Sequence, residues 1–429
     1  MADYDAIVVG AGLSGSTAAY CMAKAGLSVL VLERGDAAGV KNVTGGRLYG
    51  HSLEKIIPGF ASEAPVERKI VRERVTMMTE DSCFTADFHS ASRFADPACA
   101  SYSVLRAEFD AWLAGKAEEA GCDIVCPAHA DELLEENGKI TGVKAGDDEL
   151  TAEVVLLADG VNSLLGQKAG LKKELSPHHV AVGAKEVIEL PKGVINDRFG
   201  LNDGEGAANL FAGFASGGMV GGGFLYTNKE SLCLGLVITV ADMAKSSIRL
   251  PDLLEKFRDH PAVKPLVAGG KLVEYSAHLV PEGGLAMLPA LSADNLLLLG
   301  DAAGFCMNLG YTVRGMDLAI ASGQLAAETV VEAKGKGDFS NAALSGYKSK
   351  LEQSFVLKDM QTHKHAPDFI EHTPRMFKEY PALAADVFTQ LFRVDGTPSK
   401  LMLKKALPLI SKVGFLNLIK DGLKGTRAL

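Results

Sequence analysis

Short apolar runs that end in glycine-containing turns dominate the hydrophobic pattern of the chain. The first run, residues 5–9, leads into the turn 10–15 and a helix of small residues expected over 16–25. A second buried strand is expected over 28–32, with Glu33 at its carboxyl end. Strand, glycine turn, helix and strand in this order form a βαβ unit of the dinucleotide-binding type.

Each residue of this glycine pattern has a physical task. Gly10 permits a tight turn, Gly12 lets backbone amides approach a pyrophosphate, and Gly15 lets helix and strand pack closely. A carboxylate at Glu33 accepts the ribose hydroxyls of an adenosine and repels the 2′-phosphate of NADP. These residues predict an adenine dinucleotide, but they do not separate FAD from NAD.

Two later apolar runs make that distinction. Residues 153–157 run into Asp159-Gly160, and residues 296–299 run into Gly300-Asp301. Asp301 stands where a helix begins, so its carboxylate and the nearby amides can hold ribitol and pyrophosphate groups together. Because NAD has no ribitol, the combination predicts FAD, with a substrate domain inserted between the two halves of its binding domain.

The rest of the pattern completes an α/β fold. Antiparallel strands are predicted within 180–240, notably 183–190 and 232–238, and helical periodicity returns at 252–258, at 316–333 and beyond 335. We therefore predict a Rossmann-like FAD-binding domain of the glutathione reductase type, an inserted antiparallel β-sheet domain and a helical C-terminal region. The predicted boundaries are 1–175 with 286–335, 176–285, and 336–429.

The charge balance argues against a nucleic-acid partner. The chain of 429 residues carries 44 Lys and Arg against 53 Asp and Glu, a net charge of −9, so it has no basic field that attracts a polyanion. It begins without the basic segment and cleavage site of a secretory signal, and no apolar stretch reaches the ~18 residues that a membrane-spanning helix needs. We expect a cytoplasmic protein without a transmembrane helix.

Cysteine and histidine spacing predicts no metal site. The seven cysteines are scattered, which indicates reduced thiols, and only Cys122 and Cys126 lie close together, whereas an iron–sulfur cluster needs four ligands. The histidines near residue 370 lack the cysteine and carboxylate pattern of a closed site and suit a partner surface better; they are His363, His365 and His372.

The last 29 residues differ in charge from the rest of the chain. Apolar residues after Pro408 fall on one helical face, which predicts an amphipathic helix with a basic opposite face. Such a helix suits an anionic membrane surface, and it equally suits the acidic body or a partner subunit. The net charge of +5 over 401–429 comes from Lys404, Lys405, Lys412, Lys420, Lys424 and Arg427 against Asp421.

Several longer segments resemble the FixC proteins and, more distantly, electron transfer flavoprotein-quinone oxidoreductases, which are relatives of geranylgeranyl reductases and aromatic hydroxylases. The likeness covers essentially the whole chain. It is most specific in the segments 41–47, 103–113, 221–227, 269–275 and 300–317.

The resemblance implies roles for individual residues. Gly10, Gly12, Gly15, Glu33 and Arg34 would hold the adenosine half of FAD, and Arg106 would lie along its phosphates and ribitol; a solvated arginine at a helix start is the alternative. The remaining flavin contacts would be Lys41, Gly45, Asp159, Gly160, Gly300, Asp301, Gly304, Asn308 and Gly310. Lys41 could instead be an exposed loop cation.

A quinone pocket is implied beside the segment 221–226. There the glycine backbone of Gly221 and Gly222 would approach a quinone carbonyl, and Phe224 and Tyr226 would flank the ring. The two aromatic residues could equally be core residues of a strand.

Departures from the relatives narrow the function that the resemblance implies. The arginine that follows the Asp-Gly motif of the hydroxylases is absent after Asn162-Ser163, and no cysteine follows Cys306 to hold the [4Fe-4S] centre of the single-chain quinone oxidoreductases. The resemblance therefore implies the quinone-reducing subunit of a FixABCX-type electron-bifurcating complex. Its partners would be the electron transfer flavoprotein alpha and beta subunits, a separate ferredoxin-like iron–sulfur protein and a quinone at the inner face of the cytoplasmic membrane.

Two alternatives stay open at this stage. One is a flavin-dependent isoprenoid reductase that saturates geranylgeranyl double bonds on a lipid. The other is an assembly subunit in which FAD only stabilises the fold. No general base is assigned, because the electron steps require none.

Overall fold

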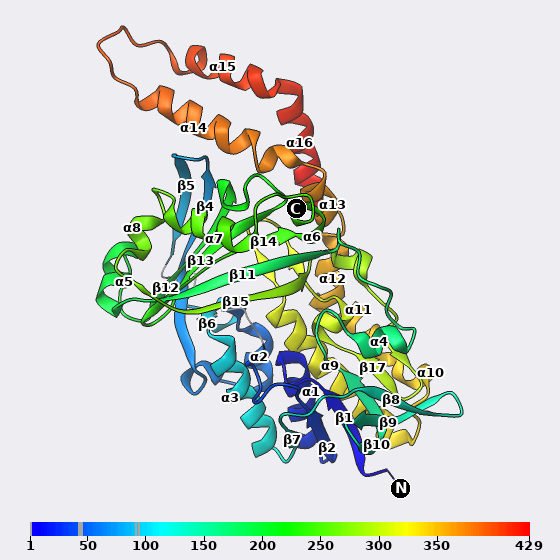
Figure 1. The fold of residues 1–429 in the computed structure, drawn as a ribbon. Coiled ribbons are helices and arrows are strands. Elements are labelled where there is room, and N and C mark those ends of the chain that lie inside the picture. The colour runs from blue at the N-terminus through cyan, green and yellow to red at the C-terminus, as the bar shows by residue number, and fades with distance from the viewer. Residues whose placement is uncertain (1, 42–45, 91, 93–94) are drawn as a thin grey trace.

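The computed structural model describes residues 2–41, 46–90, 92 and 95–429. The chain forms two large sheets with helices between and around them, and a helical arm projects from one end (Figure 1). This is the predicted α/β architecture.

The first sheet carries the apolar runs of the glycine-turn pattern. Its order is β16 (Ser292–Ala293), β17 (Leu296–Leu298), β10 (Asp148–Leu157), β1 (Tyr4–Val9), β2 (Val29–Leu32) and β7 (Asp123–Val125). The strands from β17 to β7 are parallel, and β17 and β2 are fully buried. β8 (Glu132–Glu136) and β9 (Lys139–Ala145) form an antiparallel extension of β10. Val9 pairs with both Leu32 and Leu157, and Leu157 with Leu298, so the carboxyl ends align at one edge.

Helices cover this sheet. The helix α1 (Leu13–Lys24), which is rich in small residues, packs against α9 (Met316–Lys336) and α3 (Arg106–Glu119). A Cβ at Gly323 would lie 2.3 Å from the Ser14 carbonyl oxygen, so the small residue lets α9 approach α1 closely.

The second sheet has nine strands, among them the antiparallel strands predicted within residues 180–240. Its order is β15 (Lys271–Pro281), β11 (Val180–Glu189), β14 (Ser231–Thr239), β13 (Gly221–Thr227), β12 (Glu205–Gly213), β4 (Val66–Met78), β6 (Ser101–Val104) and β3 (Gly46–Tyr49), with β5 (Cys83–His89) paired to β4. β12 and β4 are parallel, which the long connection between them permits. Strands from residues 46–104 thus share this sheet with strands from residues 180–281. The domain boundaries proposed from the sequence stay a prediction.

The two faces of this sheet have different neighbours. Leu225 and Phe211 lie on the face covered by α7 (Leu250–Asp259), where the Phe211 and Phe257 rings meet edge to face at 5.0 Å. The alternate residues Phe224 and Tyr226 point to the opposite face.

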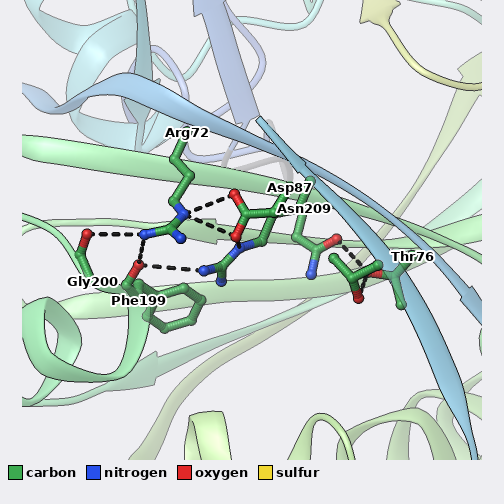
Figure 2. A network of polar contacts seen from close by, with 8 residues as sticks. Arg72, Thr76, Asp87, Phe199, Gly200 and Asn209 are labelled. Carbon is green, nitrogen blue, oxygen red and sulfur yellow. Dashed lines mark hydrogen bonds and ion pairs between the residues drawn. The ribbon is translucent and has the colours of Figure 1, made fainter. Parts of the chain in front are cut away.

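Buried and partly buried arginines fasten β4 to the inserted segment. Arg68, 1% exposed, donates to the carbonyl oxygens of Asn228, Lys229 and Glu205. It also donates to the side chain of Asn196, within the helix α5 (Lys192–Phe199). Figure 2 shows a second connection, in which Arg72 and a neighbouring arginine, Arg74, share Asp87 of β5 and donate to the carbonyl oxygen of Phe199.

The C-terminal region is helical, as predicted, but its last part differs from the expected single helix. α15 (Met402–Val413) contains Pro408 inside it, and Gly414, with φ +91°, separates it from α16 (Phe415–Ala428). A proline removes only one helical hydrogen bond, whereas the positive φ at Gly414 ends the helix. α14 (Glu379–Phe392) and α15 form the projecting arm, and α16 returns to the body (Figure 1), where buried Asp421 pairs with Arg375.

Shorter helices and a small hairpin complete the chain. No helix among the described residues is both long and apolar enough to cross a membrane. The remaining elements are α2 (His51–Ile56), α4 (Leu164–Lys168), α6 (Val240–Met243), α8 (Lys264–Val267), β18 (Met307–Asn308), β19 (Val313–Arg314), α10 (Asn341–Leu344), α11 (Gly346–Gln353), α12 (Phe355–Thr362) and α13 (Ala366–Glu371).

Arg68→Ala tests the connection between β4 and the inserted segment. The substitution leaves buried carbonyl oxygens without a donor and opens a cavity, so we expect the free energy of unfolding to fall by about 3 kcal/mol. Chemical denaturation followed by circular dichroism measures it. The control Arg393→Ala, at an exposed ion pair with Asp395, should leave that free energy almost unchanged; equal losses in both variants would contradict this role of Arg68.

Candidate functional site

The glycine turn after β1 is closely packed. Gly10 has φ +102°, and a Cβ there would lie 2.5 Å from the Ala158 carbonyl oxygen, in the turn that follows β10. A Cβ at Gly15 would lie 2.0 Å from the Gly10 carbonyl oxygen. Gly12 is the residue before the first turn of α1, whose unpaired amides suit an anionic group.

Glu33 lies buried beside this turn. Its Oε2 accepts a hydrogen bond from the Ala11 amide at 2.9 Å, and its Oε1 accepts one from the Gly35 amide at 2.8 Å. Each carboxylate oxygen can accept a further hydrogen bond. The arrangement therefore fixes the carboxylate at the carboxyl end of β2 while leaving it able to bind hydroxyl groups.

Two aspartates meet at the same edge of the sheet. Asp159 follows β10 in the turn with Gly160 (φ +81°), and Asp301 follows β17 in a 3-10 turn with Gly300 (φ +54°). Burial raises the pKa of both carboxyl groups. The Asp159 Oδ1 atom is buried and has no hydrogen-bond partner among the described residues, which leaves it free to bind a group from a ligand.

Three basic side chains surround Asp301. Arg106, at the start of α3, binds Asp110 through two hydrogen bonds of 2.6 and 2.7 Å. Burial opposes its charge, but Asp110 and then Asp301 outweigh this and raise its pKa. Lys172 and His278 are the other two. Their positive charges favour the Asp301 carboxylate and so oppose the rise in its pKa that burial causes.

Sequence reasoning missed these last two residues. The Lys172 ammonium is buried and donates to the carbonyl oxygens of Val161 at 2.6 Å and Ala302 at 2.9 Å, so it links the two aspartate turns. Its pKa is lowered by burial. His278 lies on β15, and burial lowers its pKa too. No motif marks Lys172, whereas a histidine in an alternating strand was a signal that His278 faces inward.

The loop after Asp301 holds the other predicted flavin contacts. Gly304 is buried and Gly310 exposed, both with positive φ, and Asn308 lies between them on β18. The Asn308 side chain accepts from the Gly310 amide at 2.8 Å and donates to Glu282 at 3.0 Å. Arg34 and Lys41 are exposed, and Gly45 lies outside the described residues.

The predicted quinone residues lie together on β13. Phe224 and Tyr226 stack with ring centroids 5.3 Å apart, and burial raises the pKa of Tyr226. The backbones of the two glycines pack closely against neighbouring strands. A Cβ at Gly221 would lie 2.0 Å from the Val237 carbonyl oxygen, and a Cβ at Gly222 would lie 2.5 Å from the Phe211 carbonyl oxygen.

A second charged cluster, also missed from the sequence, lies at the start of α9. The Asp317 Oδ2 atom accepts from Arg314 at 2.8 and 2.6 Å and lies 3.1 Å from the His51 Nε2 atom. Burial favours the neutral acid, yet His51 and Arg314 hold the pKa of Asp317 below its usual value. Arg314 also binds Asp359 of α12 at 2.6 Å, so the cluster joins α9 to the C-terminal helices.

Comparison with known proteins places this geometry in a family. The FAD dependent oxidoreductase family matches residues 5–174, and the ETF-QO/FixC family C-terminal domain matches residues 366–429. The chain is 55% identical over 426 residues to the probable electron transfer flavoprotein-quinone oxidoreductase YdiS of Escherichia coli K12, covering 99% of each. The chain belongs to the ETF-QO/FixC family.

Other relatives agree with this assignment. Protein FixC of Azorhizobium caulinodans is 40% identical, with 99% of this chain and 98% of that protein covered. Among solved structures, a geranylgeranyl bacteriochlorophyll reductase-like protein from Thermoplasma acidophilum has the same fold, with a TM-score of 0.74 at 22% identity over 98% of this chain and 99% of that one. The resemblance inferred from the sequence is confirmed.

As an ETF-QO/FixC family member the chain is an FAD-dependent oxidoreductase, and FAD is its cofactor. The edge of the parallel sheet fits that cofactor, because it offers closely packed glycine turns, a fixed carboxylate at Glu33 and an unpartnered buried oxygen on Asp159. Arg106 and Lys172 supply positive charge beside it, which suits a pyrophosphate.

Gly10→Ala tests the packing of the glycine turn. Because the new methyl group meets the Ala158 carbonyl and the backbone is left-handed, we expect the purified variant to lose most of its flavin, measured as the ratio of absorbance at 450 and 280 nm. Gly115→Ala is the matched control, since nothing lies within 4 Å of a Cβ there. That control should keep its flavin and gain about 0.5–1 kcal/mol of stability from helix propensity.

Proposed function

We propose that this chain passes electrons from an electron transfer flavoprotein to a membrane quinone, as the quinone-reducing subunit of a FixABCX-type bifurcating complex. The observation that carries the proposal is 54–55% identity over 99% of the chain to E. coli YdiS and FixC, the former named as a probable electron transfer flavoprotein-quinone oxidoreductase. Its partners would be the electron transfer flavoprotein alpha and beta subunits and a separate ferredoxin-like protein.

The proposed cofactor contacts follow the three turns. Gly10, Gly12, Gly15, Glu33 and Arg34 hold the adenosine half. Glu33 accepts hydroxyl groups while the backbone amides of Ala11 and Gly35 keep it in place. The groups that contact the phosphates, ribitol and ring are Arg106, Asp159, Gly160, Gly300, Asp301, Gly304, Asn308 and Gly310, with Lys41 and Gly45 from the other side.

The protein's task in this function is orientation and shielding. Bound flavin can exchange single electrons with a protein carrier and deliver two to a quinone. Asp301, kept in charge balance by Arg106 and Lys172, accepts hydroxyl groups and fixes the position of the ring. Phe224 and Tyr226, on the sheet face away from α7, offer a flat aromatic surface to a quinone head beside Gly221 and Gly222.

Anaerobic electron transfer tests the proposal. The flavin of the purified protein should be reduced by the reduced electron transfer flavoprotein and reoxidised rapidly by a short-chain quinone, both followed by absorbance. Phe224→Ala should raise the KM for quinone several-fold while leaving the reduction step unchanged, because it removes only contact area. Reduction without reoxidation by quinone would favour the isoprenoid reductase, and a flavin that accepts no electrons would favour the assembly subunit.

We also propose that the projecting arm contacts the inner face of the cytoplasmic membrane. The end of α14, the connection that follows it and the start of α15 carry apolar side chains that are mostly exposed. Phe392 is 80% and Val394 95% exposed, and Leu401, Met402 and Leu403 follow. Lys400, Lys404 and Lys405 lie among them. Apolar side chains flanked by lysines suit an anionic lipid surface.

Vesicle sedimentation tests the arm. The protein should bind vesicles that contain phosphatidylglycerol and should bind less at high salt, because screening weakens the lysine contribution. The triple variant L401S/M402S/L403S should lose most of this binding, whereas Leu164→Ser, which removes an equally exposed leucine from α4, should not. Unchanged binding by the triple variant would contradict the proposed contact and leave docking to a partner subunit.

A further inference from the structure

An ion pair lies on the sheet face that carries the stacked rings of Phe224 and Tyr226. Tyr226 pairs with Ala208 of β12, and Ala208 pairs with Glu73 of β4, so these three residues form one row across the sheet. Paired residues of neighbouring strands point to the same face, and neighbouring strands lie about 5 Å apart. Glu73, which binds Arg47, therefore stands two strands from Tyr226, with only the methyl group of Ala208 between them in the row.

Arg47 of β3 reaches this row from beyond β4. Its Nη1 atom donates to Glu73 Oε2 at 2.8 Å, its Nη2 atom donates to Glu73 Oε1, and its Nε atom donates to the Ser101 hydroxyl at 3.0 Å. The guanidinium carbon lies 4.5 Å from the centre of the Tyr49 ring. A guanidinium has five N–H donors, so one N–H on each Nη atom remains after these three bonds. Neither of them has an acceptor in the described part of the chain.

The hydroxyl groups of Tyr49 and Tyr226 are further unused donors. Neither hydroxyl has a hydrogen-bond partner among the described residues. Tyr226 lies close enough to Tyr49, Arg47 and Glu73 for their charges to act on it. These four side chains are partly exposed, whereas the opposite face of the sheet belongs to a buried apolar core. Donors that can be reached and are left without acceptors suit a bound molecule with acceptor oxygens.

The same group of side chains continues toward the proposed flavin contacts. Tyr49 lies close enough to Asp317 and Arg314, at the start of α9, for their charges to act on it. α9 follows the loop 304–310, which is proposed to line the flavin ring. The start of α9 therefore connects this loop to the donors beside Tyr226.

We propose that Arg47 and the Tyr226 hydroxyl donate hydrogen bonds to one carbonyl oxygen of the quinone whose ring lies against Phe224, an inference that rests on the proposed function. A carbonyl oxygen accepts hydrogen bonds, and negative charge develops on it as the quinone is reduced. A guanidinium that Glu73 and Tyr49 already hold in place stabilises this charge without reorganising. Arg47 and Tyr226 thus position the acceptor and determine its class.

These donors distinguish the two candidate acceptors. An isoprenoid double bond has no oxygen that accepts from Arg47 or Tyr226, so its binding would gain nothing from them. A quinone has a carbonyl oxygen on either side of its ring. Gly222 and Tyr226 are four residues, about 13 Å, apart along β13. One quinone oxygen can therefore lie beside the glycine backbone while the other lies beside the two donors.

Tyr226→Phe tests the hydroxyl, because it keeps the ring and its stacking with Phe224. The KM for a short-chain quinone should rise about fivefold through the lost hydrogen bond. The flavin content and the rate of reduction of ferricenium, a one-electron acceptor without a carbonyl group, should stay unchanged. Tyr102→Phe is the matched control. Tyr102 pairs with Leu48, which alternates with Arg47 along β3 and so points to the opposite face; its loss of a hydroxyl should not change the KM.

The double variant Arg47→Met/Glu73→Gln tests the guanidinium, and it removes both charges so that neither is left without its partner. Its KM for quinone should rise and its kcat/KM should fall about tenfold or more, with ferricenium reduction unchanged. Arg47→Lys keeps a positive charge beside Glu73 and should retain part of the rate. The control is Arg74→Met, because Arg74 pairs with Asp87 and lies over the Phe199 ring at 5.7 Å, a comparable environment on the opposite face.

The outcomes separate this inference from the proposed function. If the wild type reduces no quinone, the proposed function fails and the inference fails with it. If the wild type reduces quinone and either Tyr226→Phe or the double variant keeps the wild-type KM, the donor that this variant removes is wrongly assigned while the function stands. Equal losses with ferricenium and quinone would also overturn the assignment, because they would indicate a purely structural role.

Discussion

Two partly buried carboxylates at one edge of a parallel sheet constrain much of this molecule. Asp159 and Asp301 stand at the ends of adjacent strands, in turns that need positive φ, and burial disfavours their charged forms. A buried charge is tolerated only beside compensating groups. Those groups come from three different parts of the chain: Arg106 from α3, Lys172 from the segment after α4, and His278 from the second sheet.

One of these groups, His278, belongs to the second sheet and so connects that sheet to the charged edge of the first. His278 and the aromatic residues of β13 occupy the sheet face that is not covered by α7, since cross-strand partners share a face. The same face therefore meets the charged edge at one end and offers stacked rings farther along. A flavin held at that edge would lie between a polar anchor and a flat apolar surface.

Local patterns predicted much of this arrangement. The strand, turn and helix boundaries around Gly10, the two aspartate turns and the antiparallel strands follow from short-range sequence signals, and the family resemblance followed from several such segments together. The assignment of FAD depended on two turns almost 290 residues apart, which the parallel register of β1, β10 and β17 brings to one edge.

Other site residues could not be predicted because tertiary contacts position them. Lys172, for example, donates to two carbonyl oxygens that lie far apart in the sequence. The split between α15 and α16 was missed for a different reason. Pro408 predicts the boundary of a helix, whereas the backbone angle that ends the helix belongs to Gly414.

The interleaved second sheet has a consequence for synthesis. β4 emerges from the ribosome well before β12, its parallel partner. The carbonyl oxygens that accept from Arg68 and Arg72, in Glu205 and Phe199, are therefore translated much later than β4 itself. Until then β4 can pair only with β5 and β6, and one of its edges stays open. The nascent chain must therefore avoid edge-to-edge association during this interval, and the high charge of β4, with Glu67, Arg68, Lys69, Arg72, Glu73 and Arg74 in a single strand, opposes it.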